Sequence, residues 1–146
     1  MRSGCAVLSS DMTAPATKGF THISLSVRDL DASFHFYREV LGLRTLAEPY
    51  DGEVFEGREA MLLAGRTALC LQCHTANTGA GFDPRHTGLD HIALAVASRE
   101  DLEAFAHHLT SEGIEHSGVK PLPGFGEFIE LHDPDGILVE LHALPA

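Results

Sequence analysis

Two histidines stand at the same place in two similar segments of the chain. G-F-T-H-I-S-L-S-V at 19–27 and G-L-D-H-I-A-L-A-V at 88–96 share five of nine residues. Their histidines, His22 and His91, lie 69 residues apart (91 − 22). Packing explains a repeated apolar strand, but it does not explain a histidine kept on the polar face of both copies. Because neutral imidazole is a common metal ligand, the repetition predicts two half-sites that meet around a metal ion.

The last strand of each half adds two further candidate ligands. L-Q-C-H at 71–74 aligns with V-E-L-H at 139–142, so Gln72 corresponds to Glu140 at a spacing of 68 residues (140 − 72). Imidazole nitrogen and carboxylate oxygen bind Fe, Mn, Co, Ni or Zn, and two histidines with one carboxylate leave coordination positions open for a substrate. The predicted ligands are His22, His91 and Glu140, with the amide oxygen of Gln72 as a weak fourth. Gln72 fits a hydrogen-bonding role in a cavity equally well.

The remaining cysteines and histidines carry weaker signals. Cys70 and Cys73 form a C-x-x-C motif, but a three-residue offset in a strand puts the two thiols on opposite faces, so we interpret them as structural. His74 and His142 share a strand face with Gln72 and Glu140, where we favour solvated strand ends over hydrogen-bond donors to the ligands. The other histidines are expected on surfaces, at His35, His107, His108 and His116, and His86 is a candidate substrate contact in a linker.

The elements that must position these residues repeat in the order βαβββ. Period-2 alternation predicts the strands, and apolar residues at helical spacing predict one helix in each half. We expect a disordered tail at 1–18 and one domain at 19–146, made of a first module at 19–74, a linker at 75–87 and a second module at 88–143. The fold class is α+β, with two tandem modules forming a curved mixed sheet.

The expected strands cover about 19–27, 43–47, 59–64, 67–74, 88–97, 114–119, 126–132 and 137–143, and the helices cover 30–41 and the stretch between Ser98 and Gly113. The linker and residues 121–126 are candidate loops that cover the site.

On the two repeated strands the face away from the helix carries small and polar residues, namely His22, Ser24, Ser26, His91, Ala93 and Ala95. This face lines a cavity or is solvated, and the two alanines favour the cavity.

Composition excludes several classes of function. The chain has 146 residues, 44% of them hydrophobic, and its net charge is −11 from 21 acidic and 10 basic residues. Without a basic stripe, nucleic acid is an improbable partner, and no apolar run approaches the roughly 20 residues of a membrane span. Cys5, Cys70 and Cys73 do not suggest a disulfide framework, and the first residues lack a signal-peptide core, so we expect a cytoplasmic protein.

The paired modules resemble the vicinal oxygen chelate superfamily, which includes glyoxalase I, bleomycin-resistance proteins, fosfomycin-resistance enzymes, extradiol dioxygenases and methylmalonyl-CoA epimerase. The resemblance covers about residues 19–143 and rests on both repeated segments, on F-Y-R-E-V-L-G-L at 36–43 and on D-P-D-G-I-L-V-E-L at 133–141. It implies metal ligands at His22, His91 and Glu140 and a fourth position at Gln72. Bleomycin-type binding proteins lack these ligands.

The chain differs from individual branches of this superfamily, and these differences narrow the functions that the resemblance implies. Extradiol dioxygenases and manganese-type fosfomycin transferases carry a Tyr where this chain has Glu130. The transferases also place a Lys at the position of Lys120, which matches, but their Arg beyond the last strand has no counterpart. The ligand set resembles glyoxalase I and the epimerase. We therefore expect a metal-dependent lyase or isomerase, with a non-catalytic ligand- or antibiotic-binding protein and an Fe(II) extradiol-type dioxygenase as alternatives.

The expected substrate is a small molecule that chelates the metal through vicinal oxygens. The metal would stabilise an enolate or enediolate while Glu140 moves a proton, and Glu53 or Glu56 are weaker candidates for a second base. Members of the superfamily often form two-fold dimers, so a homodimer is expected. The sequence leaves open whether each site lies within one chain or between two.

Overall fold

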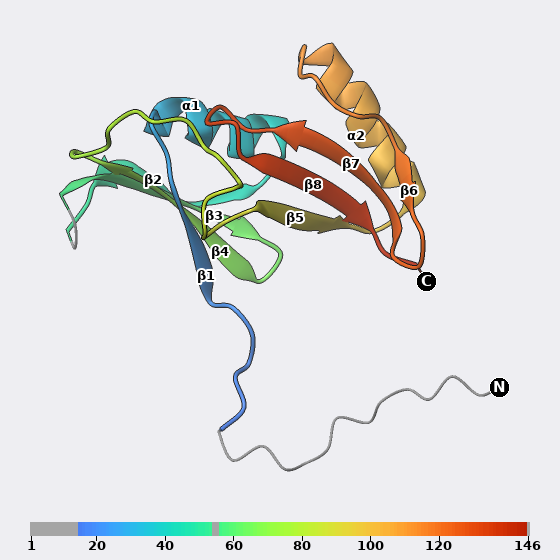
Figure 1. Ribbon diagram of the computed structural model, residues 1–146, viewed down its shortest axis with the longest axis horizontal. Helices are drawn as coiled ribbons and strands as arrows, with labels where there is room; N and C mark the ends of the chain where they lie inside the picture. The colour runs from blue at the N-terminus through green and yellow to red at the C-terminus, as the bar shows by residue number, and fades with distance from the viewer. Residues whose placement is uncertain (1–14, 54–55, 146) are drawn as a thin grey trace.

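The chain folds into two βαβββ modules, as its internal repeat predicts (Figure 1). The computed structural model describes residues 15–53 and 56–145, so most of the predicted tail at 1–18 lies outside the described residues. The first module comprises β1 (His22–Ser26), α1 (Leu30–His35), the π-helical turn η1 (Phe36–Val40), β2 (Arg44–Asp51), β3 (Gly57–Ala64) and β4 (Thr67–His74). The second comprises β5 (His91–Val96), α2 (Arg99–Ser111), β6 (Lys120–Leu122), β7 (Gly126–His132) and β8 (Leu138–Ala143).

Each module contributes one four-stranded mixed sheet. The strand orders are β1-β4-β3-β2 and β5-β8-β7-β6. The pairs β1–β4 and β5–β8 are parallel, and the other neighbours are antiparallel. The first strand of each module is therefore an edge strand, and within the described residues no other strand pairs with its outer side.

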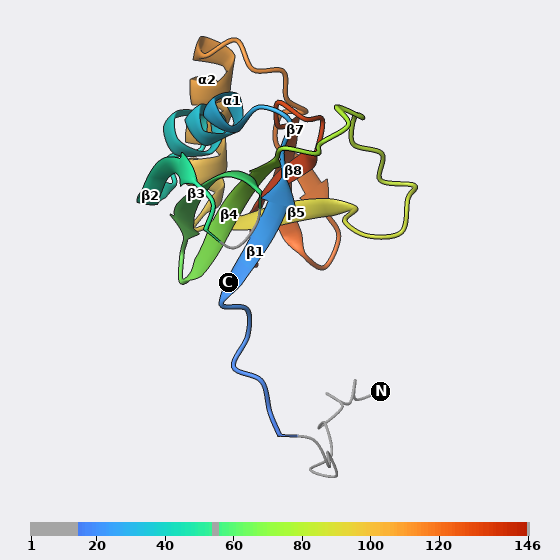
Figure 2. The ribbon, with the colours of Figure 1, turned by 90° about the vertical axis from the view of Figure 1, so that its left-hand side faces the viewer.

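Alternation along the strands separates a buried face from an open face. On β1, Leu25 is buried whereas His22, Ser24 and Ser26 are exposed. On β5, Ile92 is buried whereas His91, Ala93 and Ala95 are exposed. Figures 1 and 2 show α1 and α2 on the same side of the sheets, so the histidine-bearing faces are turned away from the helices. The predicted division of faces is confirmed.

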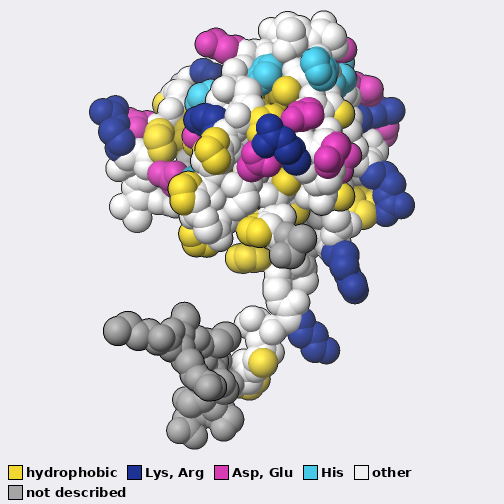
Figure 3. Space-filling view, turned by 90° about the vertical axis from the view of Figure 1, so that its right-hand side faces the viewer, with side chains coloured by type: hydrophobic (Ala, Val, Ile, Leu, Met, Phe, Trp, Pro, Cys, Tyr) yellow, Lys and Arg dark blue, Asp and Glu magenta, His cyan; other side chains and the backbone are white. Residues whose placement is uncertain are grey.

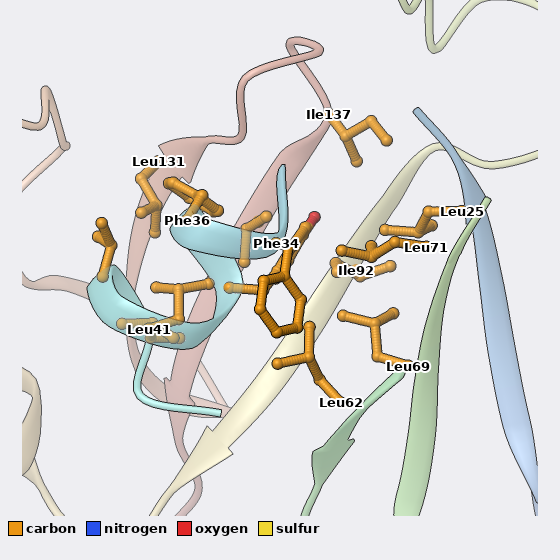
Figure 4. Close-up of a cluster of buried hydrophobic side chains, with 14 of the residues drawn as sticks. Leu25, Phe34, Phe36, Leu41, Leu62, Leu69, Leu71, Ile92, Leu131 and Ile137 are labelled. Carbon is orange, nitrogen blue, oxygen red and sulfur yellow. The ribbon is translucent and has the colours of Figure 1, made fainter. Parts of the chain in front are cut away.

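Helix α1 and the adjoining turn η1 pack between the two modules (Figure 4). Asp29 caps the start of the helix by accepting a hydrogen bond from the Ala32 amide at 3.0 Å, which satisfies one of the free donors of the first turn. In the core, Phe34 lies toward leucines of the first sheet and Phe36 lies toward Leu131 of β7 (Figure 4). A single apolar core therefore joins both sheets.

A buried polar network links α1 and η1 to the turn between β7 and β8. The Tyr37 hydroxyl donates to Asp133 Oδ2 at 2.9 Å, and the Ser33 hydroxyl donates to Asp135 Oδ2 at 3.3 Å. Arg28 Nε contacts Asp135 Oδ1 at 2.7 Å. Burial raises the pKa of Asp133, and burial together with Asp133 raises the pKa of Tyr37 far above its ordinary value. The phenol is therefore neutral and acts as the donor.

Several local predictions differ from the structure. The expected strand at 114–119 is reduced to a single bridge between His116 and Leu131, and the strand lies instead at β6, which overlaps the start of the expected cover loop at 121–126. The register of β6, with Lys120 opposite Phe128, places Pro121 on a sheet edge, where a residue without an amide proton is tolerated. His108 and His116 are half-buried and hydrogen-bonded rather than solvated.

Candidate metal centre

The second sheet brings His91 and Glu140 together on its open face. β5 and β8 run parallel, with Ala93 opposite Glu140. His91 precedes Ala93 by two residues on β5, so its side chain lies on the same face of the sheet. His91 Nε2 is 3.6 Å from Glu140 Oε2. The His91 side chain is 40% exposed and the Glu140 side chain is 14% exposed. One imidazole and one carboxylate therefore meet at a surface that opens to solvent within this chain.

Asp90 fixes the orientation of the His91 ring. The Asp90 Oδ1 atom lies 2.6 Å from His91 Nδ1, so Nδ1 carries the proton and Nε2 is the nitrogen available to a metal. A carboxylate behind a ligating imidazole is the usual support in metal sites. The hydrogen bond that His91 Nδ1 donates to Asp90 is the main cause that raises the pKa of His91, with smaller contributions from the charges of Glu140 and Glu130.

His142 belongs to this site, contrary to the prediction of a solvated strand end. Its Nε2 lies 2.7 Å from Glu140 Oε2, and its side chain is 14% exposed. The ring stacks on Phe128, with centroids 5.2 Å apart and planes inclined by 21°. The signal in the sequence is the E-L-H triplet, because residues two apart in a strand share a face.

Lys120 and Glu130 extend the polar surface across the sheet. Glu130 lies directly opposite Glu140 on the neighbouring strands β7 and β8. The Lys120 ammonium forms an ion pair with the Glu130 carboxylate and lies over the Phe128 ring, 5.1 Å from its centroid. Glu130 therefore neutralises the one lysine of this face, in the part of the chain that the structure describes.

The first sheet places His22 and Gln72 differently from the prediction. His22 is exposed at the start of β1, where its Nδ1 is 3.1 Å from the Thr21 hydroxyl. Gln72 pairs with Ser26, four residues further along β1. Cys70 is opposite Ser24, just as Glu140 is opposite Ala93. Ser24 and Ala93 each follow the strand's histidine by two residues, so Cys70 is the counterpart of Glu140. The predicted equivalence of Gln72 and Glu140 is therefore wrong by two residues.

A tyrosine and a glutamate occupy the open face of the first sheet near Gln72. Glu59 is opposite Gln72 on β3 and β4, and the Tyr50 hydroxyl donates to Glu59 Oε1 at 2.5 Å. This hydrogen bond raises the pKa of Tyr50 to about 12. Glu53 and Glu56, the predicted second bases, are exposed between β2 and β3, and their role stays a prediction.

The described residues of one chain do not complete the predicted ligand set. Among residues 15–53 and 56–145, no group of three or more His, Cys, Asp or Glu side chains is arranged to hold a metal ion. The pair His91 and Glu140 is formed, and neither His22 nor Gln72 joins it. The pair nevertheless fits a divalent ion, because an imidazole nitrogen and a carboxylate oxygen of the right chemistry lie side by side, each with a supporting hydrogen bond.

A cavity lies between the starts of β1 and β5. Its volume is about 540 Å³, and its lining includes Phe20, Ile23 and Ala68 on one side and His91, Ala93 and Leu94 on the other. Phe20 is 77% exposed. The two histidine-bearing edge strands therefore flank a largely apolar hollow.

Charged side chains of both signs are mixed on one face of the molecule. On the face shown in Figure 3, acidic, basic and histidine side chains are interspersed, and no continuous basic surface forms. Within the described residues, no helix has the length and apolar character that crossing a membrane requires. Cys70 and Cys73 are free thiols, and Cys5 lies outside the described residues.

Comparison with known proteins adds the family context. Residues 19–141 match the family described as the glyoxalase/bleomycin resistance protein/dioxygenase superfamily. The chain is 27% identical to fosfomycin resistance protein FosX of Listeria monocytogenes, over 86% of this chain and 89% of that protein. It is 31% identical to a manganese-dependent 2,3-dihydroxybiphenyl 1,2-dioxygenase of Geobacillus genomosp. 3, over 90% of this chain and only 38% of that protein.

Solved structures share the fold. A glyoxylase/bleomycin resistance protein/dioxygenase domain from Frankia sp. EAN1pec superposes with a TM-score of 0.79 at 30% sequence identity. The superposition covers 89% of this chain and all of that one.

Proposed function

The chain belongs to the glyoxalase/bleomycin resistance protein/dioxygenase superfamily, and we propose that it is a divalent-metal-dependent lyase or isomerase of the glyoxalase and epimerase type. The single observation that carries this proposal is the contact of His91 with Glu140 on an open sheet face, 3.6 Å apart. A purely structural pair would be expected to be packed or fully solvated. Here the carboxylate is nearly buried, and the imidazole beside it is accessible and held by Asp90.

We propose that a second copy of the chain completes the site. β1 and β5 are both edge strands, and their exposed histidines stand at the first residue of each. In a two-fold dimer, a contact of β1 of one copy with β5 of the other occurs twice by symmetry. Each contact would place His22 of one copy beside His91 and Glu140 of the other. This arrangement accounts for the absence of His22 from the site within the described part of one chain.

His22, His91 and Glu140 would hold the ion, with Gln72 as a proposed fourth ligand. When bound, a divalent ion of the set Fe, Mn, Co, Ni or Zn supplies Lewis-acid stabilisation for negative charge that develops on the substrate oxygens. Glu140 receives a proton from the carbon next to a carbonyl and returns it, as a general base and then a general acid. Asp90 keeps Nδ1 of His91 protonated, and His91 thereby presents Nε2 to the site.

The proposal is tested by metal analysis followed by isotope exchange. Protein purified without added metal should contain about one divalent ion per chain when measured by elemental analysis, since each dimer holds two symmetric sites. Incubated in D₂O with a panel of small hydroxycarbonyl compounds and thiol–aldehyde adducts, it should exchange the proton next to the carbonyl in at least one of them. A chain without metal at saturating Mn²⁺ would instead support the binding-protein alternative.

A dioxygenase is the second candidate, because a manganese-dependent dioxygenase is among the similar proteins. Glu130 weighs against it, since it occupies the place where the dioxygenases carry a tyrosine and is paired with Lys120. Oxygen uptake with a panel of catechols separates the two candidates. Uptake without proton exchange would overturn the lyase or isomerase proposal.

A further inference from the structure

His142 has a specific contact that its position on the sheet does not require. Its Nε2 atom lies 2.7 Å from Glu140 Oε2, whereas His91 Nε2 lies 3.6 Å from that same oxygen. A separation of 2.7 Å is a charge-assisted hydrogen bond, and 3.6 Å is not a hydrogen bond. Of the two imidazoles near Glu140, only His142 is therefore bonded to it.

The neighbouring strands hold the His142 ring in place. On one side β7 presents Phe128, which is opposite His142 and stacks on its ring at 5.2 Å. On the other side β5 presents Ala95, which is also opposite His142 and leaves room for the ring. Stacking on Phe128 and the hydrogen bond to Glu140 together hold the ring in one orientation, so its Nε2 has a fixed direction toward Glu140.

The hydrogen bond also excludes Nε2 of His142 as a metal-binding atom in this arrangement. An Nε2 that donates its proton to Glu140 has no lone pair left for a metal. It occupies Oε2 of the carboxylate and leaves Oε1 with no hydrogen bond from His142. A carboxylate held in this way presents its remaining lone pairs in a defined direction.

We propose that His142 is a positioning residue that, by donating to Oε2, fixes the orientation of the Glu140 carboxylate toward the divalent ion. This inference rests on the proposed function, because it assigns a role toward the metal that His91 and Glu140 would bind. Residues that orient metal ligands in this way typically contribute about 10- to 100-fold to metal affinity. His142 would act on metal affinity without touching the substrate.

The test uses the full-length chain and Mn²⁺ alone as the probe. His142→Phe keeps a flat ring against Phe128 and removes the donor, and we expect it to raise the Kd for Mn²⁺ about 10- to 100-fold. His142→Gln restores an N–H near the Nε2 position and should recover most of the affinity. His107→Phe, an exposed site on α2, is the control and should leave the Kd unchanged. Calorimetry gives each Kd, and thermal melting of the metal-free variants verifies that they fold.

A readout in the absence of metal tests the hydrogen bond itself. Above pH 8, the ¹⁵N chemical shifts of His142 in the metal-free chain should show the tautomer protonated at Nε2. The tautomer protonated at Nδ1 would overturn the inference. So would equal Kd values for the wild type and His142→Phe, in which case the proposed function would still stand.

Two further outcomes complete the test. Equal loss of affinity in His142→Phe and His142→Gln would indicate that the imidazole itself ligates the metal, which overturns the positioning role. A wild-type chain that binds no Mn²⁺ would overturn the proposed function and this inference together.

Discussion

Tyr37 of the first module donates a hydrogen bond of 2.9 Å to Asp133 of the second, and both side chains are buried. Asp133 Oδ1 accepts from the backbone amides of Asp135 and Ile137, which closes the turn before β8. Because β8 carries Glu140 and His142, this hydrogen bond connects the helix of one module to the strand that presents the site in the other.

Tyr37→Phe should destabilise the protein by about 1–3 kcal/mol. The variant keeps the ring but leaves Oδ2 of a buried carboxyl group without its donor, and the cost is the unrecovered desolvation of that oxygen. Urea unfolding followed by circular dichroism measures the change. Tyr50→Phe is the matched control, because its hydroxyl bonds to Glu59 at an exposed position, and it should cost less than about 1 kcal/mol. Equal costs for the two variants would contradict the role of the buried network.

His91→Ala should abolish metal binding while the chain stays folded. The side chain is 40% exposed, so its loss should change the free energy of unfolding by no more than about 0.5 kcal/mol. Removal of one of three strong ligands should reduce the metal content of the purified protein to background. His107→Ala serves as the control for loss of a surface imidazole. Stoichiometric metal in His91→Ala would refute the assigned site.

Gln72→Ala should weaken Mn²⁺ binding less than His22→Ala does. An amide oxygen is a neutral and weaker donor than an imidazole, and Gln72 lies opposite Ser26, four residues beyond His22 along β1. Titration of both variants with Mn²⁺ compares the two effects directly. A loss with Gln72→Ala as large as with His22→Ala would show that Gln72 is a full ligand.

The error in the placement of Gln72 has a simple physical origin. Side chains alternate with a period of two, so a slip of one residue exchanges the two faces of a strand, whereas a slip of two leaves every face unchanged. The alternation therefore predicts correctly that Gln72 and Glu140 lie on open faces, but it cannot distinguish Gln72 from Cys70 as the residue in the register of Glu140. Only the pairing of β4 with β1 fixes that register.

The sequence predicts some other features of the fold and the site correctly and others not. The repeat predicts both modules, and Ser98 begins α2 as its capping pattern predicts, with its hydroxyl accepting from the Asp101 amide. For His142 the sequence offers both a solvated strand end and a hydrogen-bond donor to the ligands, and it wrongly favours the first, because the stacking of the ring on Phe128 involves a neighbouring strand. The short β6 was missed because proline and glycine around it indicate a loop.

Asp90→Asn should lower the pKa of His91 in the metal-free chain. The hydrogen bond that His91 donates to Asp90 is the largest cause that raises this pKa above its usual value of about 6.5. A raised histidine pKa stabilises the fold fully below the unfolded value of about 6.5, and this contribution is lost as the pH rises through the folded pKa. Asp90→Asn should therefore reduce the stability of the metal-free chain at low pH more than at high pH.

Nuclear magnetic resonance titration of the His91 ring measures that pKa. Glu115→Gln, which removes an equal charge from an exposed position, is the control and should leave it unchanged. If both variants moved the pKa equally, the net charge of the protein, and not the contact with Asp90, would be its cause.

Mixing two inactive variants should regenerate metal sites if each site lies between two chains. A His22→Ala chain still supplies His91 and Glu140, and a His91→Ala chain still supplies His22. Random exchange of subunits at equal amounts makes half of the dimers mixed, and each mixed dimer has one complete site out of two, so about a quarter of the wild-type metal sites should return. Elemental analysis after exchange and gel filtration measures this fraction. A mixture that stays at background, although native mass spectrometry detects mixed dimers, would mean that His22 does not reach the site across an interface between two chains.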